Sequence, residues 1–336
     1  MLARLLSDPA EGAGTVVVAL GGNALLPPGE RGDIHQQFAH TRESLTPIVA
    51  LARAGWHIAV VHGNGPQIGD ELVRNQAASP ELPPLPLGVL VAGTAGWIGY
   101  MIQQSLQNAL AREGVAREVA TLVTQVLVDP EDPELREPSK PVGRVMPESR
   151  ARELSRTQGW AVGPVPGGWR RLAPSPRPIE VVESAEVARL VRSGTIVIAC
   201  GGGGTPVYRD PEGRLEGVDA VVDKDRAATV LARGIGADVL VILTNVDGVY
   251  RGFGTPRQTL LREATAGEAE RLLAAGEFGS GSMAPKVEAA IDFLRGGGRR
   301  AHIARLDQGL AAVEGRAGTT LVPDATRSED RTDRSG

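Results

Sequence analysis

The sequence predicts an α/β fold: a three-layer αβα sandwich around a mainly parallel sheet, with a small inserted subdomain that protrudes from it. Three observations lead to this prediction. Short apolar, β-branched runs alternate with longer amphipathic stretches, which is the pattern of strands joined by crossover helices. The apolar runs do not alternate with polar residues, as expected for strands covered on both faces. One proline-rich segment, residues 129–178, breaks this rhythm.

The expected elements follow one another along the chain. A strand is expected wherever a short apolar run lies between turn residues, and a helix wherever apolar residues recur at helical spacing. The expected strands are residues 15–20, 58–61, 119–128, 195–199, 239–243 and, weakly, 301–304; the expected helices are residues 44–54, 91–110, 184–192, 225–233 and 285–294.

The chain divides into two expected lobes and a lid. Residues 129–178 are too long for an ordinary loop, so we expect them to form the inserted subdomain. A turn-like stretch at residues 209–217 indicates a boundary between lobes. The expected N-terminal lobe is residues 1–128 with 179–212, and the C-terminal lobe is residues 213–324. Residues 325–336 are charged and lack apolar anchors, which predicts a disordered tail.

Composition argues against several classes of protein. A formal net charge of −4 over 336 residues argues against a general nucleic-acid binder. The N-terminus lacks a signal-peptide pattern and no apolar stretch approaches a membrane span, so no membrane association is expected. The single cysteine, Cys200, permits no intrachain disulfide and fits a cytoplasmic setting. It ends an apolar run, so we expect a small core residue rather than a nucleophile.

Lysine is scarce in this chain. Of 36 basic residues only three are lysine, namely Lys140, Lys224 and Lys286. Lysine is a compact point charge on a flexible stem and suits phosphoryl oxygens, whereas arginine is a planar fork. The three lysines therefore indicate positions where a guanidinium would fail, with compositional drift as the alternative.

Each lysine has a sequence context that fits anion chemistry. Lys224 lies between Asp223 and Asp225, and we expect both carboxylates to hold its ammonium in place; a capping aspartate beside a solvated lysine is the alternative. Lys286 opens an expected helix after a glycine-serine loop, where a cation is unfavourable unless an anion binds there. Lys140 lies between prolines that could aim it into a cleft, or it is an exposed loop lysine.

Glycine clusters follow three of the expected strands. Glycine lets the backbone approach a ligand closely and turn N–H groups toward an anion, and open α/β sheets bind ligands at the carboxyl ends of their strands. Neither the Walker A loop nor the dinucleotide fingerprint is present, so a phosphate or carboxylate site of another design is expected. His62 precedes the second cluster, and we expect it to support the turn. The clusters are Gly21-Gly22-Asn23, Gly63-Asn64-Gly65 and Gly201-Gly202-Gly203-Gly204.

These motifs resemble the amino-acid-kinase superfamily and, within it, the carbamate kinases, over roughly residues 15–322. Acetylglutamate, aspartate and uridylate kinases carry a lysine near the first glycine turn; here the resemblance places that charge at Lys224, and the proline-rich insertion resembles the protruding subdomain of carbamate kinases. The motifs are VALGGNA at 18–24, HGNGPQ at 62–67, TQV at 124–126, PSKPVG at 138–143, GWRR at 168–171 with PSP at 174–176, GGGGTPV at 201–207, VDKD at 222–225, LTNVD at 243–247 and GSMAPK at 281–286.

The resemblance implies a reversible phosphotransferase that converts ATP and carbamate to ADP and carbamoyl phosphate. It implies Mg²⁺ held mostly by the nucleotide phosphates, no protein metal site, and a homodimer. The N-terminal lobe would hold carbamate and the migrating phosphoryl group, and the C-terminal lobe the nucleotide. Residues 93–97 would form a loop whose sequence differs from the more polar one typical of the family.

The resemblance also implies a role for each site residue. Lys224 and Lys286 would contact the β- and γ-phosphates, Asp225 would hold these two lysines in register, and Lys140 would swing in with the lid. The phosphoryl group and carbamate would be bound by Gly21, Gly22, Asn23, Gly63 and Asn64, with Gly203 and Gly204 closing one wall of the cleft. The nucleotide would be bound by Thr244, Val246, Asp247, Tyr250 and Met283.

Two alternatives remain open at this point. A related kinase acting on a larger carboxylate would need an arginine clamp in the first lobe, and the sequence shows no motif for one. A nucleotide-binding regulator without catalysis would be expected to have lost a lysine, and all three are present.

Overall fold

A single large sheet organises the molecule. The computed structural model describes residues 14–26, 32–79, 81–278 and 283–324. Its main sheet has eight strands in the order β15-β17-β16-β12-β1-β2-β9-β3. Neighbours from β16 to β3 pair in parallel, whereas β17 runs antiparallel to β16 and β15 is parallel to β17. The strands are β1 Thr15–Leu20, β2 His57–His62, β3 Val119–Thr121, β9 Ile196–Ile198, β12 Val239–Thr244, β15 Glu263–Thr265, β16 Arg300–Arg305 and β17 Thr319–Val322.

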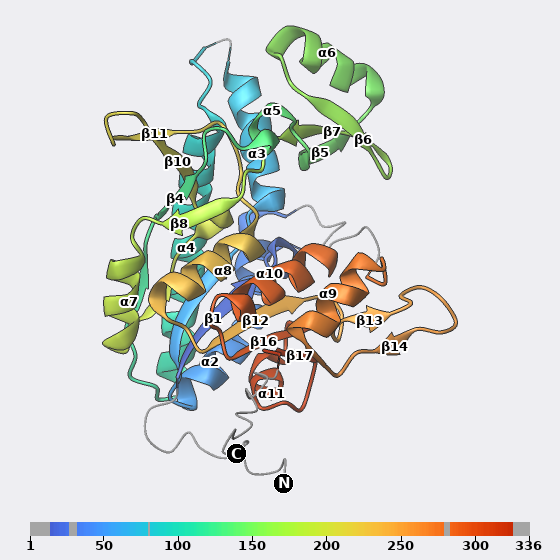
Figure 1. Cartoon of the computed structure of the whole chain (residues 1–336). Coiled ribbons are helices and arrows are strands. Elements are labelled where there is room, and N and C mark those ends of the chain that lie inside the picture. Colours follow the sequence, from blue (N-terminus) through green and yellow to red (C-terminus); the bar gives the residue numbers. More distant parts are fainter. Residues whose placement is uncertain (1–13, 27–31, 80, 279–282, 325–336) are drawn as a thin grey trace, which may run out of the picture.

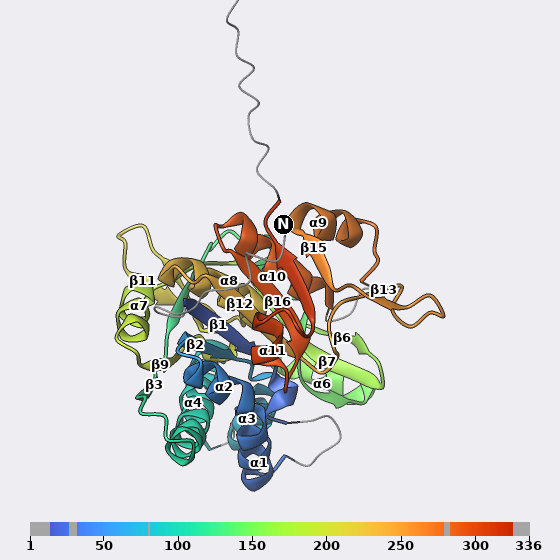
Figure 2. The same cartoon turned by 90° about the horizontal axis from the view of Figure 1, so that it is seen from below.

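Helices cover both faces of this sheet (Figure 2). Alternate residues of β1 enter two separate cores: Val17 and Ala19 pack in one, Val16 and Val18 in the other. The first core takes residues from α7 (Ser184–Arg192), α8 (Lys224–Ile235), α9 (Ala266–Ala274) and α10 (Met283–Arg295), and the second from α2 (Thr46–Arg53), α4 (Leu87–Arg112) and α11 (Gly309–Val313), with Phe38 of α1 (Ile34–Ser44) packed against it. The predicted sandwich around a mainly parallel sheet is confirmed, because the apolar strands are buried on both sides.

Smaller sheets extend the molecule beyond the carboxyl ends of these strands (Figure 1). A three-stranded sheet of order β5-β7-β6 with α6 protrudes from the body, next to α3. The remaining elements are β4 Gln125–Val128, β8 Pro178–Val181, β10 Thr205–Arg209 and β11 Leu215–Gly217 in a four-stranded sheet; β5 Lys140–Met146, β6 Val162–Val165 and β7 Gly168–Ala173; the hairpin β13 Tyr250–Arg251 and β14 Thr259–Leu260; the helices α3 Gly65–Ala78, α5 Pro133–Arg136 and α6 Glu148–Gln158; and the 3-10 turns η1 Gly22–Ala24 and η2 Gly201–Gly203.

One expected strand is wrong. Residues 119–128 form two strands of different sheets, because the chain leaves the main sheet after β3 and joins β10 through β4. Helices α1, α3, α5, α6, α9 and α11 were not expected from the sequence. The charged tail at residues 325–336 lies outside the described residues. Across the described part of the chain, no helix has both the length and the apolar character needed to cross a bilayer.

Candidate active site

A cavity of about 670 Å³ opens at the carboxyl ends of four adjacent strands. Strands β12, β1, β2 and β9 are neighbours in the sheet, so the residues that follow them meet at one edge. Gly21 and Gly22 follow β1, Gly63 and Asn64 follow β2, and Gly202 lies in the turn after β9; all five line the cavity. The structure therefore brings the three glycine clusters together. The side chain of Asn23 lies outside the described part of the structure.

The third glycine cluster winds tightly beneath the cavity. Gly202, Gly203 and Gly204 all have positive φ, of 68°, 97° and 83°, which L side chains rarely adopt. Only Gly202 lines the cavity. A Cβ on Gly203 would lie 2.2 Å from the carbonyl oxygen of Val222, and one on Gly204 would lie 2.2 Å from Cγ2 of Val126. The prediction that Gly203 and Gly204 form the cavity wall is therefore wrong, since both pack behind it.

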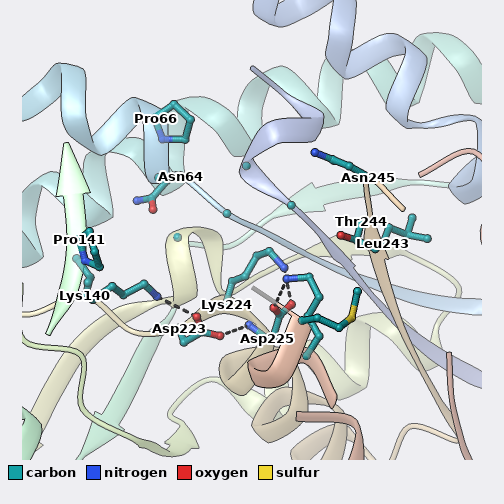
Figure 3. A pocket seen from close by; sticks show the side chains of 18 of the residues that line it. Asn64, Pro66, Lys140, Pro141, Asp223, Lys224, Asp225, Leu243, Thr244 and Asn245 are labelled. Carbon is teal, nitrogen blue, oxygen red and sulfur yellow. Dashed lines mark hydrogen bonds and ion pairs between the residues drawn. The ribbon is translucent and has the colours of Figure 1, made fainter. Parts of the chain in front are cut away.

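Asp225 bonds two of the lysines that line the cavity, and its contact with Lys224 is seen in Figure 3. It lies in the first turn of α8, and its Oδ1 accepts a hydrogen bond from Nζ of Lys224. Its Oδ2 accepts one from Nζ of Lys286, which α10 supplies, at 3.1 Å. The carboxylate is buried and each lysine is largely buried. Two ammonium groups on one carboxylate leave a net positive charge at the floor of the cavity.

The third lysine reaches the same cavity from the protruding subdomain. Lys140 begins β5, and its Nζ donates to Oδ2 of Asp223 at 3.0 Å. Oδ1 of Asp223 caps α8 by accepting from the backbone N–H groups of Asp225 and Arg226, at 2.9 and 3.3 Å. We expected both Asp223 and Asp225 to bond Lys224. Asp225 does, but Asp223 bonds Lys140 instead, because capping α8 turns its carboxylate in that direction.

The pKa of Asp223 follows from this arrangement. Burial alone would raise the pKa of its carboxyl group. The Lys140 and Lys224 ammonium groups, together with the Asp225 backbone N–H, outweigh burial and hold that pKa well below its usual range. Asp223 is therefore a carboxylate at neutral pH and carries a full negative charge in the cavity wall.

Asn64 is fixed from behind by the long helix α4. Its Nδ2 donates to Oγ1 of Thr94 at 2.8 Å, and the Thr94 hydroxyl in turn bonds the backbone carbonyl oxygens of Leu90 and Val91. Thr94 is buried inside α4. Residues 93–97 are therefore helical, as in the expected helix at 91–110, and the loop that the family resemblance implied there is wrong. This contact was not predictable, because a threonine within a helix is common and does not mark a site.

His62 lies under the glycine turns rather than in the cavity. Its ring is fully buried, with Nδ1 3.1 Å from the carbonyl oxygen of Gly63. A Cβ on Gly201 would lie 2.6 Å from its Nε2, so the imidazole packs directly against the third cluster. Burial lowers the pKa of His62 to about 4, despite hydrogen bonds with backbone groups of Gly63 and Ala95 that raise it. The ring is neutral at physiological pH.

The buried His62 predicts acid sensitivity of the fold. Unfolding restores a pKa near 6.5, so below that pH the unfolded chain binds a proton that the folded chain takes up only near pH 4. Stability is therefore full above pH 6.5 and falls as the pH drops to about 4, by up to about 3 kcal/mol for this group. Urea unfolding of wild type and His62→Gln across this range should show a flatter pH dependence in the variant. His35→Gln, at an exposed position on α1, is the control, and an equal slope in all three proteins would contradict the expectation.

The other half of the cavity is more apolar. Of the residues expected to bind nucleotide, Thr244, Val246, Tyr250 and Met283 line the cavity, and Asp247 does not. Asp247 is exposed, with one carboxylate oxygen 3.3 Å from the Arg305 guanidinium and the other accepting from the Tyr250 hydroxyl at 3.4 Å. Its place in the cavity was wrongly expected, because the backbone turns after Val246. The lining residues that the sequence did not single out for the site are Pro66, Ile68, Pro141, Val142, Val221, Val222, Leu243, Asn245, Gly248, Phe253 and Phe278.

The protruding subdomain rests on α3 at a close backbone crossing. A Cβ on Gly69 would lie 2.7 Å from Cα of Gly143 in β5. Nearby, Arg144 and Asp70 form an ion pair of 2.6 Å. The height of β5 above α3, and with it the position of Lys140, therefore depends on Gly69 having no side chain.

Substitution of Gly69 by alanine is expected to displace β5. The obstruction is backbone rather than a flexible side chain, so we expect a loss of about 1–3 kcal/mol in unfolding free energy and about a tenfold loss in kcat/KM. Urea denaturation and steady-state kinetics measure both. Gly217→Ala is the matched control, since a Cβ there has no neighbour within 4 Å. Equal behaviour of the two variants would refute the crossing as a support of the site.

No metal-binding cluster is evident among the residues that the structure describes: no three His, Cys, Asp or Glu side chains lie close enough to hold an ion. The two cavity carboxylates, Asp223 and Asp225, already bond ammonium groups. Cys200 is buried, and burial raises the pKa of its thiol to about 12, so this sulfur is a core atom.

The fold and the lysine-lined cavity define a small-molecule kinase. The model of the amino acid kinase family matches residues 14–305, and this chain belongs to that family. It is similar to carbamate kinase from Pyrococcus horikoshii, with 44% identity over 311 residues that cover 92% of this chain and 99% of that protein. Carbamate kinase from Halobacterium salinarum is 46% identical over 308 residues, covering 91% and 98%.

Solved structures give the same result. Carbamate kinase from Giardia lamblia bound to AMP-PNP superposes with a TM-score of 0.86 at 38% identity, covering 93% of this chain and 99% of that one. The predicted resemblance to carbamate kinases is thereby confirmed.

Proposed function

We propose that this chain transfers a phosphoryl group reversibly between ATP and carbamate, giving ADP and carbamoyl phosphate. The observation that carries the proposal is the convergence of Lys140, Lys224 and Lys286 on one cavity at the carboxyl ends of four strands, three of which are followed by glycine clusters. The similarity to carbamate kinases over nearly the whole chain supports the same substrate.

The site residues fit a phosphoryl transfer that needs no general base. A carbamate oxygen is already anionic and can form a bond to the γ-phosphorus while the bond to the bridging oxygen of ADP breaks. The protein must then hold two anions together and balance the charge on the moving group. The backbone N–H groups of Gly22 and Asn64 and the ammonium groups of Lys224 and Lys286 would do this.

The two halves of the cavity would separate the two substrates. The glycine turns after β1 and β2 would hold carbamate and the migrating group. The half lined by Thr244, Val246, Tyr250 and Met283 would hold the nucleoside. Both cavity carboxylates, Asp223 and Asp225, bond lysines, so the nucleotide phosphates would hold most of the coordination of Mg²⁺, whose charge would offset theirs.

A coupled assay tests this function. Incubation with ADP, Mg²⁺ and carbamoyl phosphate should yield ATP, detected with hexokinase and glucose-6-phosphate dehydrogenase. ADP formation with carbamate should exceed that with acetylglutamate, because no arginine lies among the cavity-lining residues to clamp a second carboxylate. Turnover with acetylglutamate alone would favour the related kinase, and nucleotide binding without turnover would favour the regulator.

We also propose that the enzyme is a cytoplasmic homodimer that packs through α4. Val89, Gly93, Gly96 and Tyr100 are spaced four, three and four residues apart on one side of this helix, and Val89 and Tyr100 are half exposed. A Cβ on Gly93 would have no neighbour within 4 Å, so this position is open for a second copy.

Substitution of Gly93 by glutamate is expected to yield monomers. The new side chain meets nothing within its own chain, and a charge at the centre of an apolar contact would be buried unpaired. Sedimentation velocity should show dimers for wild type and monomers for Gly93→Glu. Gly217→Glu, equally unobstructed on β11, should remain dimeric. A monomeric wild type, or a dimeric Gly93→Glu, would exclude this face.

A further inference from the structure

Asp223 makes two contacts that serve different purposes. One carboxylate oxygen caps α8, and the other holds the ammonium of Lys140, which belongs to the protruding subdomain. A helix cap alone needs no charge, and Thr265 caps α9 in this same chain with a neutral hydroxyl. Capping occupies one carboxylate oxygen of Asp223 and does not explain why the other holds the Lys140 ammonium.

The charge of Asp223 is also unfavourable for the proposed reaction. A cavity that binds phosphate and carbamate gains from cations, yet Asp223 puts a carboxylate into its wall. Lys140 neutralises it in the ligand-free protein. The side chains of Lys140 and Asp223 both line the cavity and are partly exposed, at 32% and 26%, so a phosphoryl group that enters the cavity can compete with Asp223 for the Lys140 ammonium.

We propose that Asp223 is the docking residue of the protruding subdomain. In the ligand-free enzyme its carboxylate holds Lys140 over the cavity and so fixes the position of β5. When a phosphoryl group binds, the ammonium of Lys140 moves from Asp223 to the phosphoryl oxygens. Asp223 is thus a positioning residue that acts through Lys140. The inference rests on the proposed function only for the identity of the displacing anion.

The rest of the subdomain contact explains why this pair sets the position. On the α3 side, β5 is limited by the crossing of Gly69 and Gly143 and by the exposed pair of Arg144 and Asp70. Neither contact reaches α8.

Val142 of β5 is buried in a cluster with Leu72 and Val221, and the Val221 N–H donates to the carbonyl oxygen of Pro174 at 3.0 Å. These contacts hold the base of the subdomain. The hydrogen bond of Lys140 to Asp223 is the side-chain contact that reaches α8 from the first residue of β5, so its loss gives that end more freedom while the base stays in place.

A distance measurement in the ligand-free protein tests the docking without any assay of activity. The single native cysteine, Cys200, is buried, so spin labels can be placed selectively at Ser149→Cys on α6 and Asn108→Cys on α4, both exposed positions. Pulsed electron paramagnetic resonance should give one narrow distance in the parent and a broad or doubled distribution in Asp223→Asn. Asparagine keeps the capping oxygen and removes only the charge.

Two further variants complete this measurement. Lys140→Met breaks the same pair from the other side and should broaden the distribution equally. Asp33→Asn, the same substitution at the cap of α1, should leave it narrow. A distribution in Asp223→Asn and Lys140→Met as narrow as that of the parent overturns the proposal.

Kinetics test the electrostatic part. Lys140→Met exposes the Asp223 carboxylate to the substrate, so we expect the KM for carbamoyl phosphate to rise at least tenfold. Adding Asp223→Asn to that variant should lower the KM again by threefold or more, with little change in kcat. A further rise in KM in the double variant would show that the two residues act independently and would overturn the proposal. If wild type fails to make ATP, the proposed function falls, and the spin-label distances alone decide the docking.

Discussion

Replacing Lys286 with alanine is expected to lower kcat by about 10²–10³-fold, the size of effect seen when one charge-stabilising donor is removed from an active site. The ammonium of Lys286 lies at the cavity floor and shares Asp225 with Lys224. During transfer it would offset charge on the migrating phosphoryl group, and a methyl group cannot. Single-turnover ATP formation from ADP and carbamoyl phosphate measures this loss directly.

The fold should tolerate this change. Asp225 keeps its hydrogen bond from Lys224, so no buried carboxylate is left unpaired. Lys286→Arg is the informative companion, because it keeps the charge and replaces a point donor with a planar fork too large for a largely buried position. We expect it to remain folded and strongly impaired. Wild-type turnover in Lys286→Ala would remove Lys286 from the mechanism.

The sheet was predictable because burial on both faces leaves a direct mark on the sequence. In β1, Val16 and Val18 face one core and Val17 and Ala19 face the other, so consecutive residues are apolar because helices cover both sides of the strand. The break between β3 and β4 at Leu122–Thr124 was not predictable. The residues on either side are equally strand-like, and only the pairing of β4 with β10 separates the two strands. Helix α3 was missed because it begins inside a glycine turn, at Gly65.

The sequence allowed us to predict which residues line the cavity better than which of them bond to one another. The three lysines were predicted because lysine is scarce in this chain, and the glycines because they follow expected strands. Which carboxylate meets which lysine depends on the cap of α8: its geometry sends Asp223 to Lys140, which lies 83 residues away. Whether Gly203 and Asp247 face the cavity likewise depends on turns of the backbone, which cannot be predicted from the identity of the residues.

Asp225→Ala is expected to damage stability as well as catalysis. The ammonium groups of Lys224 and Lys286 both bond this buried carboxylate, and without it two like charges face each other in a site of limited solvation. Removing one partner of a buried pair costs about 3–5 kcal/mol, so urea denaturation should show a loss approaching that size. The kcat should also fall by at least about 10²-fold, because neither lysine is held in place.

Sulfate separates this explanation from a general packing defect. If two unpaired ammonium groups cause the instability, an anion that binds between them should restore stability as its concentration rises, by the mass-action linkage of binding to folding. Glu113→Ala removes a carboxylate from an exposed pair with Arg53 and should cost at most about 1 kcal/mol, with only the general response to sulfate. If Asp225→Ala responded to sulfate no more than this control, the two lysines would not form the anion site on which the proposed reaction depends.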